Sequence, residues 1–238
     1  MAAEKVTLIT GAGRGIGRAL ALKLAMPGAK LALASRTYLE LEEVAQQARA
    51  LGADVCTVTT DVTSASQVQA FVTEAQVTYG RIDRVYHGAG VGVLSSALEL
   101  KDDDFDRMLD TNLKGLFYLT RAAIPHMLSS GGGQVVVPVG ILGRYVMRNS
   151  AGYSASKFAV VGLVKALGEE FNKRGMRFTL LYFGGVDTSF WDHIDMKVQR
   201  DRMLSADAAA DAVLYAFNAP GSAIVNEIVM QPDSHQFV

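Results

Sequence analysis

The hydrophobic positions along this chain change repeatedly between two spacings. Short continuous apolar runs such as residues 6–9 are typical of buried strands, and longer stretches repeat apolar residues every three or four positions, as helices do. The short runs predict strands at residues 6–9, 30–34, 55–59, 84–87, 134–139, 177–183 and 223–230. The helical stretches lie between the strands, at residues 14–26, 38–51, 64–79, 105–128, 153–172 and 206–218. The fourth helix is expected to bend near Gly115 and Pro125.

This alternation predicts an α/β fold. Continuous apolar strands separated by helices indicate a parallel sheet that is covered on both faces, and right-handed crossovers then give a doubly wound, Rossmann-type sheet. We expect one domain over residues 1–238, because the chain contains no linker, repeat or low-complexity segment. Residues 184–205 are the least regular stretch and carry the chain's one tryptophan. Their place after a strand predicts a lid over a ligand site.

Composition and charge exclude several classes of function. Half of the residues are hydrophobic and 20% are charged, which is typical of a globular protein rather than a disordered one. The net charge is −1 and no basic block is present, so we expect no nucleic-acid partner and no membrane partner. The sequence offers no signal peptide and no spanning stretch of about 18 apolar residues, so the expected location is the cytoplasm. Cys56 has no neighbours at metal-ligand spacing, and neither a disulfide nor a metal site is expected.

A glycine-rich turn stands between the first predicted strand and the first predicted helix. Its glycines at 11, 15 and 17 have the spacing T-G-x-x-x-G-x-G, while Ile16 breaks the stricter G-x-G-x-x-G pattern. Glycines allow a tight turn and close approach of the backbone to phosphates, and the helix N-terminus supplies free N–H groups. A tight turn without a ligand would have the same composition. Its position after the first strand favours dinucleotide binding.

The end of the second predicted strand indicates which dinucleotide. An acidic residue there would bind the ribose hydroxyls of NAD, but the sequence reads Ala34-Ser35-Arg36. Arg36 and Arg14 can each bind a 2′-phosphate through paired N–H groups, although either arginine alone could equally be a solvated surface charge. The missing acid favours NADP(H).

Tyr153 and Lys157 form the strongest candidate for catalysis. They open the helix that follows the fifth strand, one helical turn apart, so they share a helix face at the edge of the sheet where ligands bind. A nearby ammonium favours the charged form of a phenol and so lowers the phenol's pKa, which suits an acid–base catalyst. The spacing alone is weak evidence, because a surface pair on an amphipathic helix looks the same.

Taken in order, these motifs resemble the short-chain dehydrogenase/reductase family, of the classical type, over nearly the whole chain. The resemblance rests on the glycine turn, on Asp61-Val62 after the third strand, on Asn112 and on the pair Tyr153 and Lys157. It implies that Tyr153 donates a proton, that Lys157 lowers the tyrosine's pKa and holds the nicotinamide ribose, and that Asn112 keeps a water in a proton relay. Asp61 would contact the adenine and Thr188 the nicotinamide end. The cofactor-binding residues implied are Gly11, Arg14, Gly15, Ile16, Gly17, Ser35, Arg36, Asp61, Val62, Gly88, Ala89, Gly90, Tyr153, Lys157, Gly184, Val186 and Thr188.

The chain departs from the family pattern at three places. The family usually has a serine thirteen residues before the tyrosine, where it hydrogen-bonds the substrate carbonyl, and this chain has Gly140 there. Losing one such donor typically costs about 10²–10³ in rate. The family's Asn-Asn-Ala-Gly after the fourth strand reads His87-Gly88-Ala89-Gly90 here, and its Pro-Gly after the sixth strand reads Phe183-Gly184. We interpret His87 as a packed residue at a strand end rather than a catalytic one.

Within the family, residues 186–191 and 225–232 are similar to the bacterial sepiapterin reductase-like branch. The predicted substrate residues are Gly140, Ile141, Tyr145 and Trp191, which would give a largely apolar wall. Trp191 has two interpretations that stay open here, stacking on a flat substrate or anchoring the lid to the body of the protein.

The predicted function is NADPH-dependent reduction of a ketone or aldehyde to an alcohol, with Tyr153 as proton donor and Gly140 in place of the serine. The substrate would be a small carbonyl compound, pterin-like ones included. A second hypothesis is an NADP(H)-binding sensor or partner protein with little catalysis, and a different reaction on the same scaffold is a third. The resemblance also implies a homodimer or homotetramer, formed through the helices at residues 105–128 and 153–172.

Overall fold

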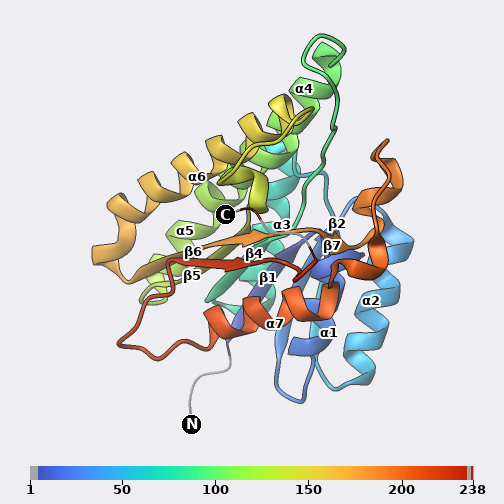
Figure 1. The fold of residues 1–238 in the computed structure, drawn as a ribbon. Coiled ribbons are helices and arrows are strands. Elements are labelled where there is room, and N and C mark those ends of the chain that lie inside the picture. The colour runs from blue at the N-terminus through green and yellow to red at the C-terminus, as the bar shows by residue number, and fades with distance from the viewer. Residues whose placement is uncertain (1–4, 235–236, 238) are drawn as a thin grey trace.

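The computed structural model describes residues 5–234 and 237. Its centre is a seven-stranded parallel sheet in the order β3-β2-β1-β4-β5-β6-β9, shown in Figure 1. The strands are β1 (Val6–Thr10), β2 (Lys30–Ser35), β3 (Asp54–Thr59), β4 (Arg84–His87), β5 (Gly133–Pro138), β6 (Met176–Phe183) and β9 (Glu227–Met230). The doubly wound parallel sheet expected from the sequence is therefore confirmed.

Helices cover both faces of the sheet (Figure 1). One face packs against α1 (Gly15–Leu24), α2 (Tyr38–Ala50) and α7 (Ala206–Phe217). The other packs against α3 (Ala65–Tyr79), α5 (Gly115–Ser129) and α6 (Ala151–Phe171). Successive strand residues alternate between the two cores, so that Leu8 is fully buried on one side of the sheet and Ile9 on the other. Burial on both faces explains why the strands read as unbroken apolar runs.

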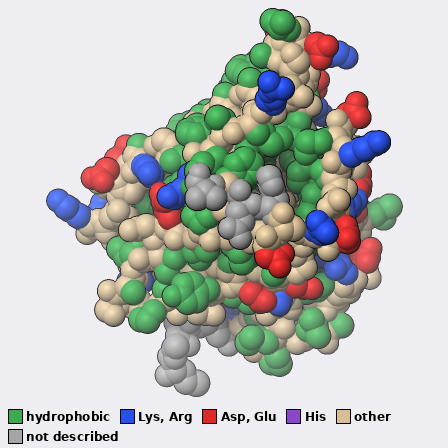
Figure 2. All heavy atoms as spheres, in the orientation of Figure 1, with side chains coloured by type: hydrophobic (Ala, Val, Ile, Leu, Met, Phe, Trp, Pro, Cys, Tyr) green, Lys and Arg blue, Asp and Glu red, His purple; other side chains and the backbone are tan. Residues whose placement is uncertain are grey.

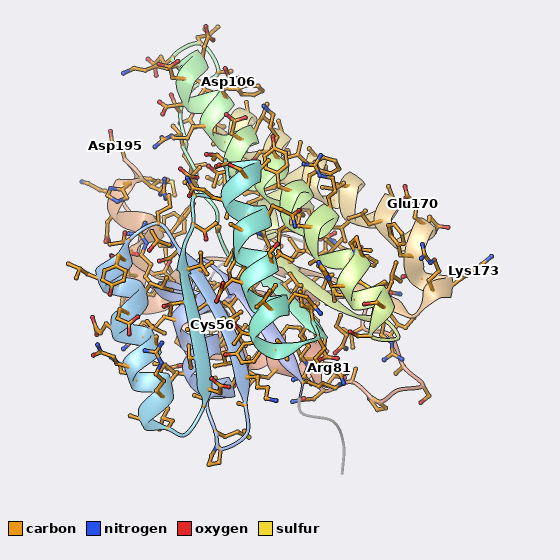
Figure 3. All side chains as sticks on the ribbon, turned by 180° about the vertical axis from the view of Figure 1, so that it is seen from behind. Cys56, Arg81, Asp106, Glu170, Lys173 and Asp195 are labelled. Atoms are coloured by element: carbon orange, nitrogen blue, oxygen red, sulfur yellow. The ribbon has the colours of Figure 1, made fainter. Side chains whose placement is uncertain are left out.

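The strand order reverses between β1 and β4. Chain order runs outward from β1 through β2 to β3, and then returns to β4 on the other side of β1. The turns that follow β1 and β4 therefore leave the sheet in opposite directions and open a crevice at its carboxyl edge. In Figure 3, Asp106 and Asp195 lie toward this edge of the sheet, and Arg81 lies toward the opposite edge.

The long helix expected at residues 105–128 is divided in the structure. Helix α4 (Asp102–Met108) begins earlier, a π-helical segment follows at Leu109–Lys114, and α5 begins at Gly115. Gly115 packs directly on Val62, since a Cβ built at this glycine would lie 2.9 Å from Val62 Cγ2. The sequence predicted a bend near Gly115 and Pro125. The structure instead has a π-segment that ends just before Gly115, a feature common at functional sites, and Pro125 lies inside α5.

The last strand is shorter than the sequence predicts. It was expected to span residues 223–230, but β9 begins at Glu227. The guanidinium of Arg177 donates hydrogen bonds to the carbonyls of Pro220, Gly221 and Ala223. Within the expected strand, the carbonyl of Ala223 binds Arg177 and that of Val225 accepts from Thr179 Oγ1 at 2.6 Å. These two carbonyls therefore bind side chains of β6, and the backbone bond from Leu180 N to Asn226 O is the first to join the two segments.

Residues 184–205 form an internally bonded segment, which we call the lid. Its base is a short parallel pair, β7 (Val186–Asp187) and β8 (Leu204–Ser205). Between them, Arg200 forms ion pairs with Asp187 and Asp192. The predicted lid thus has a defined shape, and its closure over a ligand stays a prediction.

Cys56 lies on β3, at the edge of the sheet (Figure 3). It is partly buried, and burial raises the pKa of its thiol to about 11. The thiol is therefore protonated near neutral pH and a poor nucleophile. Within the described part of the chain, no helix has the length and apolar character needed to cross a membrane.

Candidate active site

A cavity of about 890 Å³ opens at the carboxyl edge of the sheet, above β1, β4, β5 and β6. All the residues that the sequence predicted to bind the cofactor line it, from the glycine turn to Thr188. Gly140, Ile141 and Trp191 line it as well. In Figure 2, hydrophobic side chains gather on this face between the protruding α4 and the lid. One cavity thus joins the glycine turn to an apolar end.

The glycine turn needs glycine for two reasons. Gly11 and Gly15 have φ values of +66° and +56°, which favour a residue without a Cβ. A Cβ at Gly11 would lie 2.6 Å from the carbonyl carbon of Gly88, and one at Gly17 would lie 2.2 Å from Gly11 O. The turn after β1 is therefore packed against the turn after β4. This packing leaves the N-terminus of α1 facing the cavity, as a pyrophosphate site requires.

The end of β2 brings Ser35 and Arg36 to the cavity beside Arg14. Both arginines are exposed, and Ser35 Oγ donates to Thr37 O at 3.2 Å. Glu40 on α2 also lines the cavity, with Oε2 3.4 Å from a Cβ built at Gly13. Glu40 was not expected from the sequence, because it comes from the first turn of α2 rather than from the end of β2. Two cations and a hydroxyl fit a phosphate group, with one carboxylate next to them.

Asp61 follows β3 at the far wall of the cavity. Its Oδ1 accepts hydrogen bonds from Thr63 N at 2.9 Å and from Thr63 Oγ1 at 2.8 Å. Its own N–H donates to Gln67 Oε1 at 2.8 Å. The turn is thus held by its own side chains, in the position that the family resemblance assigns to the adenine.

Tyr153 and Lys157 lie one turn apart on α6 and face the cavity together. Lys157 Nζ lies 5.6 Å from the centre of the Tyr153 ring and donates to Pro138 O at 3.4 Å. Burial lowers the pKa of Lys157 to about 8 and raises the pKa of Tyr153. The sequence predicted a lowered tyrosine pKa, but burial is the dominant influence in the protein alone. At neutral pH the site therefore holds a neutral phenol beside an ammonium that is mostly charged.

Asn112 lies behind the cavity wall rather than on it. It belongs to the π-segment, and its Oδ1 accepts from Val91 N at 2.9 Å. Its Nδ2 donates to Val91 O and to Ser156 Oγ, each at 2.9 Å. Asn112 therefore fastens the loop after β4 to the helix that carries Tyr153. The proton-relay role that the resemblance implies stays a prediction.

Gly140 has a backbone conformation that a serine does not readily adopt. Its φ and ψ are +79° and +160°, a region occupied almost only by glycine. Both Val139 N and Gly140 N donate to Leu181 O, at 2.8 and 3.1 Å. A Cβ at Gly140 would lie 3.7 Å from Tyr153 Oη, so space for a side chain exists. This chain thus lacks the hydroxyl of the family pattern, and its backbone conformation here disfavours the side chain that would supply one.

His87 is packed inside the protein and is absent from the residues that line the cavity. Its Nδ1 lies 3.0 Å from Thr10 Oγ1. Burial lowers the pKa of its imidazole to about 3, so the ring is neutral. These observations agree with the interpretation of His87 as a packed residue at a strand end.

The apolar end of the cavity is bounded by the lid. Trp191 Nε1 donates to Val186 O at 2.9 Å, and its ring meets Phe190 edge-on at 5.5 Å. Phe190 in turn lies 5.8 Å from the Tyr153 ring. Both of these Trp191 contacts lie within the lid, and the ring that reaches the body of the protein is Phe190. Trp191 also contributes to the cavity wall, so its two interpretations stay predictions.

Tyr145, expected on this wall, is not among the lining residues. Phe237 stacks on it, with ring centroids 5.9 Å apart and an interplanar angle of 18°, and lines the cavity itself. Met147 and Met196 are further lining residues that sequence reasoning missed. Nothing in the local pattern of the chain brings residue 237 next to residue 145.

Among the described residues, no group of three or more His, Cys, Asp or Glu is arranged to hold a metal ion.

Comparison with known proteins agrees with this geometry. The family model for short chain dehydrogenase matches residues 5–199. A sepiapterin reductase of Chlorobaculum tepidum is 35% identical over 97% of this chain and 97% of its own length. An uncharacterized oxidoreductase of Staphylococcus aureus is 38% identical over 96% of this chain and 97% of its own length.

A solved structure shares the fold. It is an alcohol dehydrogenase from Thermococcus sibiricus complexed with 5-hydroxy-NADP, with a TM-score of 0.91 and 30% identity over 99% of each chain. The sequence motifs, the sheet order and these matches all lead to the same assignment. The chain belongs to the short-chain dehydrogenase family.

Proposed function

We propose that this protein binds NADPH and reduces a ketone or aldehyde to an alcohol, with Tyr153 as the proton donor. The observation that carries the proposal is a single cavity in which the glycine turn, Tyr153 and Lys157 meet. Alone, the glycine turn could be a tight turn without a ligand, and the tyrosine–lysine pair could be a surface pair on a helix. Together in one cavity, a phosphate site and a phenol–ammonium pair suit hydride transfer. The family assignment supports the same class of reaction.

The residues present fit a dinucleotide with a 2′-phosphate. A Cβ at position 11, 15 or 17 would collide with or crowd neighbouring atoms, so the glycines allow the tight turn that faces the cavity. Arg14, Ser35 and Arg36 supply hydrogen-bond donors for the 2′-phosphate. Lys157 would hold the nicotinamide ribose and Thr188 the nicotinamide end. When bound, NADPH supplies a hydride to the carbonyl carbon of the substrate.

The chain's own residues manage the proton. Tyr153 is neutral at pH 7, since burial raises its pKa, and it donates its proton to the carbonyl oxygen as negative charge develops there. The ammonium of Lys157, on the same helix face, stabilises the phenolate left behind. The lid residues Phe190 and Trp191 line the apolar end of the cavity, and closure of the lid over a bound substrate would exclude water from it.

Gly140 makes a slow enzyme the expected outcome. A serine hydroxyl at this place would stabilise the developing oxyanion, and losing one such donor costs about 10²–10³ in rate. A substrate that carries its own hydroxyl beside the carbonyl, or a water in the space at Gly140, would replace part of this stabilisation. The similarity to a sepiapterin reductase supports pterin-like carbonyl compounds as candidates.

The test is oxidation of NADPH by the purified protein across a panel of sepiapterin, diketones, quinones and short keto acids. NADH is run in parallel, because Arg14 and Arg36 predict a preference for the phosphorylated cofactor. Tyr153→Phe should abolish turnover while NADPH still binds. Turnover retained by this variant would exclude Tyr153 as the proton donor.

A second candidate function is NADP(H) binding with little catalysis, as a sensor or partner protein. The observation that favours it is Gly140, whose backbone conformation disfavours the serine of the family pattern. The two candidates separate in one experiment. Tight NADPH binding with no turnover across the panel would support the second candidate, and turnover of any panel member would exclude it.

A further inference from the structure

The chain after β9 turns back over the carboxyl edge of the sheet. We call residues 231–234 together with Phe237 the C-terminal strap. Its first residues pack on Gly184, where a Cβ would lie 2.7 Å from Pro232 Cδ. Pro232, Ser234 and Phe237 all line the cavity that holds Tyr153. The strap is thus part of the wall of the site, on the side away from the glycine turn.

Side-chain hydrogen bonds hold the strap in place. Gln231 Oε1 accepts from Phe237 N at 2.7 Å, and Gln231 Nε2 donates to Phe237 O at 3.2 Å. This reciprocal pair satisfies both backbone groups of Phe237, as a β-bridge would. Ser234 Oγ donates to Arg202 O at 2.9 Å, which joins the strap to the lid.

The ring of Phe237 is fixed by stacking as well. It lies on Tyr145, nearly parallel, with centroids 5.9 Å apart. Tyr145 N donates to Ile141 O at 3.0 Å, so the stacked pair stands on the short helical turn that follows Gly140. Gly140 in turn faces the hydroxyl of Tyr153. A chain of contacts thus leads from the Phe237 ring to the Tyr153 hydroxyl, and both groups line the cavity in which the reacting carbonyl would lie.

We propose that Phe237 is a specificity-determining residue, which selects carbonyl substrates bearing a flat ring next to the reacting carbon. The proposal rests on the proposed reductase function, since it assigns the apolar end of that same cavity. A ring held by stacking and by two backbone hydrogen bonds offers a rigid face, and aromatic pairs favour offset stacking or edge contacts. Rigidity lowers the entropy lost when the substrate orders against that face.

The test uses two diketones that share the reacting group and differ in the ring, 1-phenylpropane-1,2-dione and butane-2,3-dione. Phe237→Ala should lower kcat/KM for the phenyl compound by about tenfold, the size expected for one aromatic pair with its buried area. For butanedione the change should stay within about twofold. Phe237→Trp should retain the preference. The control is Tyr215→Ala, which removes an exposed ring on α7. Equal effects on both substrates, or no effect on either, would overturn the proposal.

A binding measurement tests the role of Phe237 independently of the role of Tyr153 as proton donor. Trp191 is the chain's one tryptophan and lines the same cavity, so its fluorescence reports occupancy without turnover. With NADP⁺ present, which has no hydride to transfer, Phe237→Ala should weaken binding of the phenyl diketone and leave that of butanedione unchanged, and Gln231→Ala should act in the same direction. Unchanged binding of the phenyl compound would refute the role of Phe237. Turnover retained by Tyr153→Phe would instead refute the proton donor.

Discussion

Position 140 illustrates how a single backbone angle changes the meaning of a motif. In the sequence, Gly140 stands where the family usually has a serine. In the structure, its φ of +79° and the two hydrogen bonds to Leu181 O fix a path that other residues adopt at a cost of about 1–3 kcal/mol. The substitution Gly140→Ser therefore adds a hydroxyl and also strains the backbone. Its effect on the rate combines these two changes.

A matched pair of variants separates these two effects. Gly140→Ala and Gly140→Ser introduce the same strain, and only the second adds a hydroxyl near Tyr153. Both should lower the free energy of unfolding by about 1–3 kcal/mol, measured by urea unfolding. If the missing donor limits the rate, kcat of the serine variant should exceed that of the alanine variant by at least about tenfold. Equal rates would show that another group already stabilises the substrate oxygen.

Lys157 is predicted to reduce stability at neutral pH. Burial lowers its pKa in the folded state to about 8, below the ordinary value of 10.5. Between these values the unfolded chain binds more protons than the folded one, so the lysine's effect on stability improves as pH rises through this window. Below the window the buried ammonium destabilises the fold by its full amount.

Lys157→Met should therefore raise Tm at pH 7, by about 2–4 °C for each kcal/mol in a domain of this size. The gain should shrink as pH approaches 10, where the wild-type lysine is neutral in the folded state. Thermal melts at pH 7, 8.5 and 10 check this, with Lys173→Met, an exposed lysine just beyond α6, as the control. A gain that is constant with pH would point to packing rather than charge.

At the scale of elements, the π-segment between α4 and α5 is the joint that positions the site. It presents Asn112 to both backbone groups of Val91 and to Ser156, three contacts that tie the loop after β4 to α6. Regular helix geometry would rotate this side chain, because a π-segment holds one more residue per turn.

Asn112→Ala is expected to lower the free energy of unfolding by about 2 kcal/mol, because it removes the partner of both backbone groups of the partly buried Val91 and a hydrogen bond to the buried Ser156. NADPH affinity should fall together with stability, since the same loop lines the cavity. Urea unfolding and NADPH titration measure the two effects, with Gln69→Ala on the exposed face of α3 as the control. A loss of stability with unchanged NADPH affinity would separate the segment from the site.

The elements also show what the sequence could predict. The glycine turn and the pair Tyr153 and Lys157 were predictable because their roles depend on short-range spacing after a strand. The start of β9 was not, since the side chains of Arg177 and Thr179 bind the carbonyls of Ala223 and Val225, more than forty residues away in the chain. The stacking of Phe237 on Tyr145 is likewise a long-range contact, and no local periodicity reports it. Glu40 was not predicted either, because it lies on α2, whereas the motif places the acidic residue that distinguishes NAD from NADP at the end of the second strand.

For the whole molecule, association through α5 and α6 stays a prediction. Phe117 on α5 and Phe158 on α6 are 39% and 46% exposed, and a groove of about 660 Å³ runs between the two helices. Exposed aromatic residues on neighbouring helices are typical of protein–protein interfaces.

Sedimentation velocity should therefore find a dimer or a tetramer. Phe158→Glu should shift the protein toward the monomer, because a carboxylate in an apolar interface lacks a partner. Tyr215→Glu, on the opposite side of the sheet, should leave the assembly unchanged. Monomeric wild-type protein at micromolar concentration would contradict the prediction.

The strap has a practical consequence for anyone who handles this protein. Phe237 lines the cavity at the carboxyl edge of the sheet, whereas β1 begins with Val6 at the opposite edge. An affinity tag fused directly behind Phe237 would join the chain beside the cavity and next to the stacked ring. A tag fused directly ahead of Val6 would join it at the opposite edge of the sheet. Assays with the two fusions should differ, and the amino-terminal one gives the more faithful substrate profile.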